Sequence, residues 1–196
     1  QSEGLFTEGT ISDWLEQSIH MFIAKTRSKR IIVGSSMGGW LALLLTRVLL
    51  RDDPRAARRM AGIVLIAPAA DMTSDLMLNT FPPEALEQLK ARGVYERPSD
   101  YGDPMPITFK LLEDGAKHLL LKTGLELPCP VRILQGSSDP DVPPSHALKV
   151  FEALSGPDIT MTLIKGGDHR LSTPGQLTLI RETVLQLAER ADGITP

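Results

Sequence analysis

The chain has 196 residues, of which 42% are hydrophobic and 23% are charged, and its formal net charge is -3 at pH 7. A chain of this length and composition folds as one globular domain with a buried core, and its charge balance excludes the strongly basic surface of a nucleic-acid-binding protein. The most apolar stretch, 40–50, is interrupted by Arg47 and is shorter than the roughly 18 residues of a membrane-spanning helix, so we expect no membrane span.

The first part of the chain alternates between helical and extended patterns. After a polar loop at 1–9, apolar residues at helical spacing predict an amphipathic helix over 11–26. The short apolar run 31–33 predicts a strand buried on both faces. A mostly apolar helix over 38–50 and a second apolar strand over 62–67 follow, as expected for helices packed against a sheet.

The middle of the chain, 71–127, differs in character from the rest. Prolines cluster there, two short helices are predicted near 83–92 and 106–121, and no strand pattern is visible. We interpret 71–127 as a small helical cap inserted into a core that is formed by 1–70 and 128–196.

The last part of the chain returns to the alternating pattern. A buried strand is predicted at 131–135, a helix that begins at Pro144 and ends near Leu154, an edge strand at 159–164 and a last helix at 175–190. Alternation of strands and helices predicts a three-layer α/β fold, with a mostly parallel sheet and helices on both faces.

A candidate nucleophile lies between the first predicted strand and the helix that follows it. Gly34, Ser36 and Gly38 form a G-x-S-x-G motif, which in this context predicts a nucleophile elbow that holds the Ser36 hydroxyl above the strand ends. Glycines at 34 and 38 would leave room where neighbouring backbone crowds the turn. The backbone N–H of Met37 would supply an oxyanion donor. Ser35 is the competing hydroxyl, but it occupies an x position of the motif.

A serine nucleophile needs a general base, usually a histidine. On this kind of fold the expected chain order is serine, acid, histidine. His169 follows the last predicted strand and comes last in this order, so we predict that it is the base. For the other three histidines we predict surface or packing roles; they are His20, His118 and His146.

The base in turn needs a carboxylate that orients it, placed after a strand. Asp139 comes first after the turn that follows the third core strand, and we predict that it is the acid. Asp141 is the alternative, although it could instead charge the start of the next helix, and Asp71 after the second strand is a further alternative. For Asp168 we predict a structural role, because adjacent side chains on a loop point apart.

Together these segments resemble the α/β-hydrolase family over nearly the whole chain and in the expected order. A closer similarity, to the depalmitoylating and acyl-glucuronide-cleaving branch and its bacterial members, is carried by residues 33–40, 137–139 and 167–170 and by a stretch of 93–101. The resemblance implies that Ser36 is the nucleophile, Asp139 the acid and His169 the base.

The predicted function is a serine hydrolase that cleaves carboxylic esters or thioesters through an acyl-enzyme, on a small molecule or an acylated protein. A peptidase or lactonase on the same fold and a non-catalytic scaffold are the alternatives. Apolar residues of 71–127 could line an acyl pocket or only pack the cap onto the core; these are Leu76, Met77, Leu78, Phe81 and Phe109.

The predicted mechanism needs no metal and no organic cofactor. The single cysteine, Cys129, excludes an intramolecular disulfide and a zinc site built from cysteines. No secretory signal is visible, so we expect a reducing interior compartment, the cytoplasm or, in a eukaryote, the mitochondrial matrix.

The resemblance also sets an expectation for the start of the domain. In the family, several strands and a Gly-rich loop with a second oxyanion N–H precede the elbow, whereas a single predicted helix precedes Ser36 here. We therefore expect the front of the domain to be absent, with residues 1–196 alone neither a stable monomer nor an efficient esterase.

Overall fold

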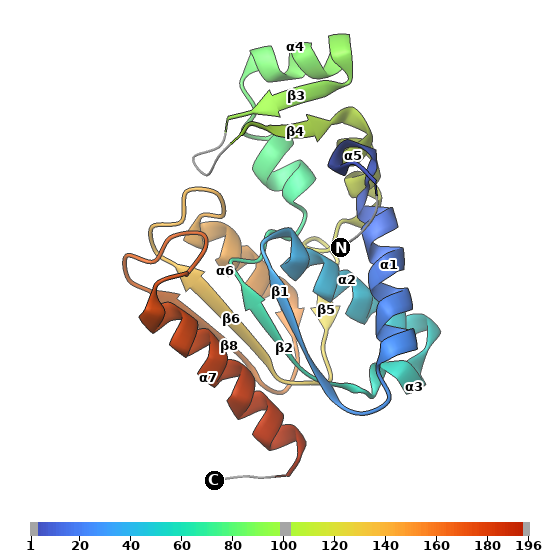
Figure 1. Cartoon of the computed structure of the whole chain (residues 1–196), viewed down its shortest axis with the longest axis vertical. Coiled ribbons are helices and arrows are strands. Elements are labelled where there is room, and N and C mark those ends of the chain that lie inside the picture. The colour runs from blue at the N-terminus through green and yellow to red at the C-terminus, as the bar shows by residue number, and fades with distance from the viewer. Residues whose placement is uncertain (1–3, 99–102, 194–196) are drawn as a thin grey trace.

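A parallel sheet runs through the computed structural model, which describes residues 4–98 and 103–193 (Figure 1). Its strands pair in the order β1-β2-β6-β8 and are all parallel. Their bounds are Arg30–Ser35 for β1, Met60–Ile66 for β2, Val131–Gly136 for β6 and Ile159–Ile164 for β8. All four predicted strands are therefore confirmed, and so is the parallel sheet.

The two inner strands are the most buried, as their continuous apolar runs predict. In β2 and β6 almost every residue is buried, whereas β8 alternates between half-buried and exposed side chains for most of its length, as expected of an edge strand. The prediction that 31–33 is buried on both faces is wrong: Val33 is 49% exposed. Within the described residues β1 pairs only with β2, so this strand is covered less than an inner strand.

Helices cover both faces of the sheet, as predicted (Figure 1). On one face α1, α2 and α6 pack into a large core that includes Trp40, Leu43 and Ile63. On the other face α7 packs over a smaller cluster that includes Val64 and Leu187. The bounds are Ile11–Lys25 for α1, Met37–Asp52 for α2, Pro54–Ala57 for the short α3, Pro144–Ala153 for α6 and Pro174–Ala191 for α7.

The helix starts follow from local sequence signals. Thr10 accepts a hydrogen bond from the N–H of Asp13 and the Asp13 carboxylate accepts one from the N–H of Thr10, so the two form a capping box. Thr173 and Gln176 do the same for α7. Among the described residues, no helix combines the length and the apolar character needed to cross a membrane.

Most of the described part of residues 71–127, which we call the cap segment, lies beyond the carboxyl ends of the core strands, whereas its end, with β5 (Leu125–Glu126), runs back beside the core (Figure 1). The helix predicted near 83–92 is confirmed as α4. The prediction that the segment lacks strands is wrong, because β3 and β4 form an antiparallel hairpin. The predicted helix 106–121 is also wrong in part, since it covers the end of this hairpin, α5 and η3. The bounds are Thr73–Leu78 for η2, Pro83–Arg92 for α4, Val94–Arg97 for β3, Met105–Thr108 for β4, Phe109–Gly115 for α5 and Ala116–His118 for η3.

Short elements complete the chain. The 3-10 turn η1 (Phe6–Glu8) lies in the predicted loop 1–9, and β5 (Leu125–Glu126) pairs with β7 (Leu154–Ser155). Residues 99–101, which contribute to the resemblance, lie outside the described residues.

One buried carboxylate holds the cap segment to the core, and another joins the start of the cap segment to its end. Asp114 of α5 accepts hydrogen bonds from the backbone N–H and the hydroxyl of Ser12 at the start of α1. Asp71 accepts hydrogen bonds from the backbone N–H groups of Leu120 and Leu121. These contacts place the cap segment over the end of the sheet at which the predicted site residues lie.

Candidate active site

Ser36 occupies a strained turn between β1 and α2. Its φ is 53° and its ψ is -122°, a backbone conformation that costs a non-glycine residue about 1–3 kcal/mol. The turn is held by a 2.9 Å hydrogen bond from the Ser36 N–H to the Ile66 carbonyl and by a 3.1 Å bond from the Ala69 N–H to the Ser36 carbonyl. Ser35, the competing hydroxyl, ends β1 with an exposed side chain.

The glycines of the motif differ in what they make possible. A Cβ at Gly34 would lie 2.4 Å from the Gly38 carbonyl oxygen, so Gly34 is required for the tight turn, as predicted. The prediction is wrong for Gly38, because a Cβ there would meet nothing within 4 Å. Gly39 is the second crowded position, since a Cβ there would lie 3.0 Å from the Cβ of Pro68.

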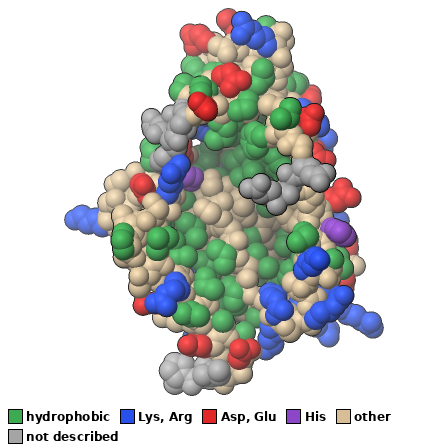
Figure 2. Space-filling model, in the orientation of Figure 1, with side chains coloured by type: hydrophobic (Ala, Val, Ile, Leu, Met, Phe, Trp, Pro, Cys, Tyr) green, Lys and Arg blue, Asp and Glu red, His purple; other side chains and the backbone are tan. Residues whose placement is uncertain are grey.

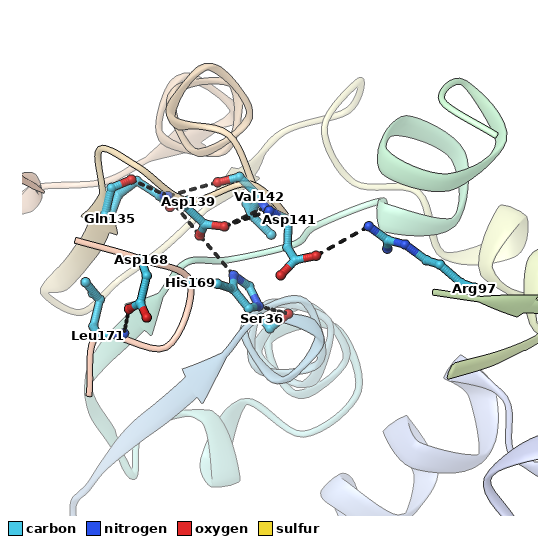
Figure 3. Close-up of polar contacts among 10 residues, drawn as sticks. Ser36, Arg97, Gln135, Asp139, Asp141, Val142, Asp168, His169 and Leu171 are labelled. Carbon is cyan, nitrogen blue, oxygen red and sulfur yellow. Dashed lines mark hydrogen bonds and ion pairs between the residues drawn. The ribbon is translucent and has the colours of Figure 1, made fainter. Parts of the chain in front are cut away.

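Ser36, His169 and Asp139 form a continuous chain of hydrogen bonds (Figure 3). The Ser36 Oγ lies 3.1 Å from His169 Nε2, and His169 Nδ1 lies 2.9 Å from Asp139 Oδ2. The three residues follow β1, β8 and β6 in that order, and the carboxyl ends of these parallel strands lie at the same end of the sheet. A hydroxyl, an imidazole and a carboxylate arranged in this way can act as a nucleophile, a general base and the group that orients the base.

The Asp139 carboxylate is buried and accepts four hydrogen bonds. Its Oδ1 accepts from the backbone N–H groups of Asp141 and Val142, both at 2.9 Å. Its Oδ2 accepts from Gln135 Nε2 at 3.2 Å as well as from His169. Burial raises the pKa of this carboxyl, but hydrogen bonds from His169, Val142 and Gln135 outweigh burial, and the pKa lies below its ordinary value.

The pKa of His169 is raised above its ordinary value. The hydrogen bond to Asp139 is the largest cause, burial opposes it, and the charges of Asp139, Asp141 and Asp168 add to it. The imidazolium that forms when His169 takes a proton is therefore stabilised where it lies. Such a group binds a proton from a serine hydroxyl more readily than a free imidazole does.

The alternative acids make their hydrogen bonds and ion pairs with other partners than His169. Asp141 faces an arginine of the cap hairpin, with its Oδ1 3.4 Å from Arg97 (Figure 3). Asp71 is engaged with the backbone at Leu120 and Leu121. Asp168 accepts a 2.9 Å hydrogen bond from the Leu171 N–H, which is a structural contact within its own loop.

The other histidines are also placed away from Ser36. His20 is exposed on α1. His118 lies 2.7 Å from the Ser12 hydroxyl, next to Asp114. His146 is buried in α6, where its Nε2 lies 2.9 Å from the Ala70 carbonyl.

A cavity of about 700 Å³ opens onto Ser36 and His169 between the cap segment and the sheet. Figure 2 shows this hollow, with hydrophobic side chains gathered where the cap segment overhangs it. Met37, the first residue of α2, lines the cavity beside Ser36, so its backbone N–H lies at the positive end of a 16-residue helix.

Two of the residues predicted to bind an acyl chain line this cavity and the others do not. Leu76 and Met77 of η2 are part of its wall. Phe81 packs edge-on against Tyr95, with ring centroids 5.2 Å apart, and Phe109 and Leu78 are 44% and 42% exposed. The hairpin supplies lining residues that the sequence did not suggest, because its strands were not predicted; they include Arg97, Met105 and Ile107.

One group of side chains in the described ranges has the proximity that metal ligands need. The ligand atoms of Asp139, Asp141 and His169 lie within 4.8 Å of one another. His169 Nδ1 and both oxygens of Asp139 are already engaged in the hydrogen bonds above. The contact between Asp139 and His169 is therefore accounted for by the hydrogen-bonded chain to Ser36, whereas the Asp141 carboxylate contacts Arg97.

The fold and this arrangement of side chains define an α/β hydrolase. The family model described as the alpha/beta hydrolase family matches residues 4–178, so the chain belongs to that family.

Two curated relatives share this similarity. The mitochondrial palmitoyl-protein thioesterase ABHD10 of mouse is 27% identical over 197 residues, covering 100% of this chain and 64% of that protein. The human protein of the same name is 26% identical over 195 residues, covering 98% of this chain and 61% of that protein. The chain therefore spans less than two thirds of the length of these relatives.

Solved structures agree with this assignment. A protein from Agrobacterium vitis S4, provisionally named a hydrolase, superimposes with a TM-score of 0.90 at 40% identity, covering 94% of this chain and 70% of that one. Mouse alpha/beta hydrolase domain-containing protein 10 has a TM-score of 0.81 at 27% identity, covering 97% of this chain and 74% of that one.

Proposed function

We propose that the protein is a serine hydrolase that cleaves carboxylic esters or thioesters through an acyl-enzyme. The observation that carries the proposal is the hydrogen-bonded chain from Ser36 Oγ through His169 to the buried Asp139 carboxylate. A serine hydroxyl is a weak nucleophile near neutral pH, and a histidine within hydrogen-bond reach is what activates it.

In the first half of the proposed reaction, His169 Nε2 takes the Ser36 proton while Oγ attacks the acyl carbonyl carbon. The negative oxygen that forms is stabilised by the Met37 N–H at the start of α2. His169 then gives its proton to the departing alcohol or thiol, and the acyl group remains on Ser36 as an ester. In the second half, His169 takes a proton from water, the hydroxide attacks this ester, and the acid leaves as Ser36 regains its proton.

We propose that the acyl group of the substrate lies in the cavity beside Leu76 and Met77. The walls there are mostly apolar, and the volume of about 700 Å³ suits a medium or long chain. The names of the mouse and human relatives, palmitoyl-protein thioesterases, support an acylated protein as the substrate, and an acylated small molecule is the alternative. We further propose that residues 71–127 act as the cap of this site.

We propose two alternatives for the cellular location, the cytoplasm and the mitochondria. The names of the mouse and human relatives favour mitochondria. Imaging of the tagged full-length protein in its native cell decides between the two.

The test is labelling with a fluorophosphonate, which reacts with an activated serine. We expect the wild-type protein and the Ser35→Ala variant to be labelled, and the Ser36→Ala variant to be unlabelled and to lose activity by several orders of magnitude. An unlabelled wild-type protein that nevertheless folds would favour a non-catalytic scaffold. Matched ester, thioester, lactone and anilide substrates then separate the proposed activity from a lactonase or peptidase.

A further inference from the structure

Gln135, near the end of β6, places a neutral amide directly behind the Asp139 carboxylate (Figure 3). Its side chain is fully buried. Three oxygens surround its Nε2: the Val142 carbonyl at 2.9 Å, the Gly136 carbonyl at 3.1 Å and Asp139 Oδ2 at 3.2 Å. The amide therefore bridges the acid and the backbone on both sides of it.

The orientation of this amide is fixed by its surroundings. If the amide were turned over, its oxygen would face three acceptor oxygens and no donor. In the observed orientation the Gln135 Oε1 is buried and has no hydrogen-bond partner among the described residues. Leaving such an oxygen unpaired costs about 1–3 kcal/mol, whereas a methionine would fill the same space without that cost. Packing alone does not account for an amide here.

We propose that Gln135 is a positioning residue for the acid: its amide fixes the Asp139 carboxylate and shares the oxygen that faces His169. This inference rests on the proposed function, because it concerns the same site. Asp139 Oδ2 accepts from both Gln135 Nε2 and His169 Nδ1. A donor on a carboxylate oxygen draws negative charge from it and so weakens its attraction for a neighbouring cation. Gln135 thereby limits how basic His169 becomes and keeps more of it neutral near pH 7.

The other charged groups around His169 would be unchanged by substitution of Gln135. Asp141 contacts Arg97 from the cap hairpin, and Asp168 is engaged with the Leu171 N–H. Arg170 lines the same cavity. The three hydrogen bonds of Gln135 Nε2 do not involve the side chains of these groups. A change in the pKa of His169 on substitution of Gln135 is therefore transmitted through Asp139 and through the turn 139–142 that Gln135 holds.

The experiment compares the full chain with Gln135→Met, which keeps the volume and removes the donor, and Gln135→Asn, which keeps an amide that is one methylene too short. The pKa of His169 is measured by NMR titration of its ring protons, assigned by their loss in His169→Gln among the four histidines of the chain. The acid limb of the kcat/KM profile for a p-nitrophenyl ester is the second readout. Thr46→Val is the matched control, because it removes a different buried hydrogen bond, to the Ala42 carbonyl.

We expect the pKa of His169 and the acid limb to rise by about half a unit or more, about threefold in proton affinity, in both Gln135 variants. Neither should move in Thr46→Val, even if that variant unfolds at a lower temperature. An unchanged or lowered pKa in the Gln135 variants would overturn the proposal, and if Gln135→Met does not fold, Gln135→Asn decides. The NMR titration does not need activity, so an inactive wild-type protein counts against the proposed function and leaves the role of Gln135 decidable.

Discussion

Replacing Asp139 by asparagine separates the two candidate acids, because the environment of this carboxylate leaves an amide no good orientation. Asp139 accepts two backbone N–H groups at Oδ1, and Gln135 and His169 at Oδ2. An asparagine has one acceptor oxygen and one donor NH2 group. Backbone N–H groups cannot turn away, so the oxygen would face them and the NH2 group would face His169.

That orientation reverses the tautomer of His169. Facing a donor, Nδ1 must give up its proton, and the remaining proton then lies on Nε2, opposite Ser36 Oγ at 3.1 Å. A nitrogen that carries a proton cannot take the serine proton, and loss of the acid in this way lowers kcat about 10⁴-fold. At about 1.36 kcal/mol for each tenfold change, the barrier rises by about 5.5 kcal/mol.

The assay is kcat and kcat/KM for a p-nitrophenyl ester, with Asp141→Asn as the matched control. Asp141 contacts Arg97 at 3.4 Å with both side chains about one third exposed, and such a pair contributes little, so we expect its loss to lower kcat less than about tenfold. The pKa of His169 should also fall in Asp139→Asn, because the hydrogen bond to Asp139 is the largest cause of its rise. A larger loss in Asp141→Asn than in Asp139→Asn would refute this reasoning and transfer the role to Asp141.

Three further predictions concern the turn, the pH profile and the cavity. Gly34→Ala should abolish fluorophosphonate labelling and lower the unfolding temperature, because its Cβ would lie 2.4 Å from the Gly38 carbonyl oxygen. Gly38→Ala, whose Cβ would meet nothing within 4 Å, should keep the labelling and the unfolding temperature of the wild type. Equal effects of the two substitutions would contradict the elbow geometry. The kcat/KM should rise with pH through a pKa above the ordinary 6.5 of histidine, because catalysis needs neutral His169 and its pKa is raised; an acid limb below that value would contradict this. Each added methylene of the acyl chain should raise kcat/KM about fourfold until the cavity is full, at about 0.8 kcal/mol per methylene, whereas a preference for acetyl esters would exclude an acyl pocket.

The positions of Ser36, Asp139 and His169 could be predicted because a local sequence pattern indicates each of them. Ser36 follows a strand and precedes a helix, and Asp139 and His169 each follow a later strand. The carboxyl ends of parallel strands lie at the same end of a sheet, so the sequence predicts that all three residues lie at that end. Their contacts depend in addition on the strand order β1-β2-β6-β8 and on the course of the loops, which the structure supplies.

The cap was harder to predict for physical reasons. Its strands β3 and β4 have four residues each, too few to show a clear alternation, and Pro106 within β4 argues against a strand. Apolar composition also does not say which way a side chain faces, so Phe81 and Phe109 were grouped with Leu76 and Met77. Gln135 did leave a signal, a polar residue directly after the apolar pair Ile133 and Leu134 of a buried strand, but its partners follow only from the structure.

The acid is also part of the loop that holds it, and this shapes how its loss should be measured. Asp139 Oδ1 binds the N–H groups two and three residues further on, so the turn after β6 is built around the carboxylate. Asparagine keeps an acceptor for these two groups, whereas alanine removes it and leaves the Val142 N–H, which is buried, without its partner. We therefore expect Asp139→Ala to lower the unfolding free energy by about 1–3 kcal/mol more than Asp139→Asn, with both variants inactive. Denaturant unfolding of the two variants measures the difference, and equal stabilities would show that the carboxylate serves only catalysis and not the loop.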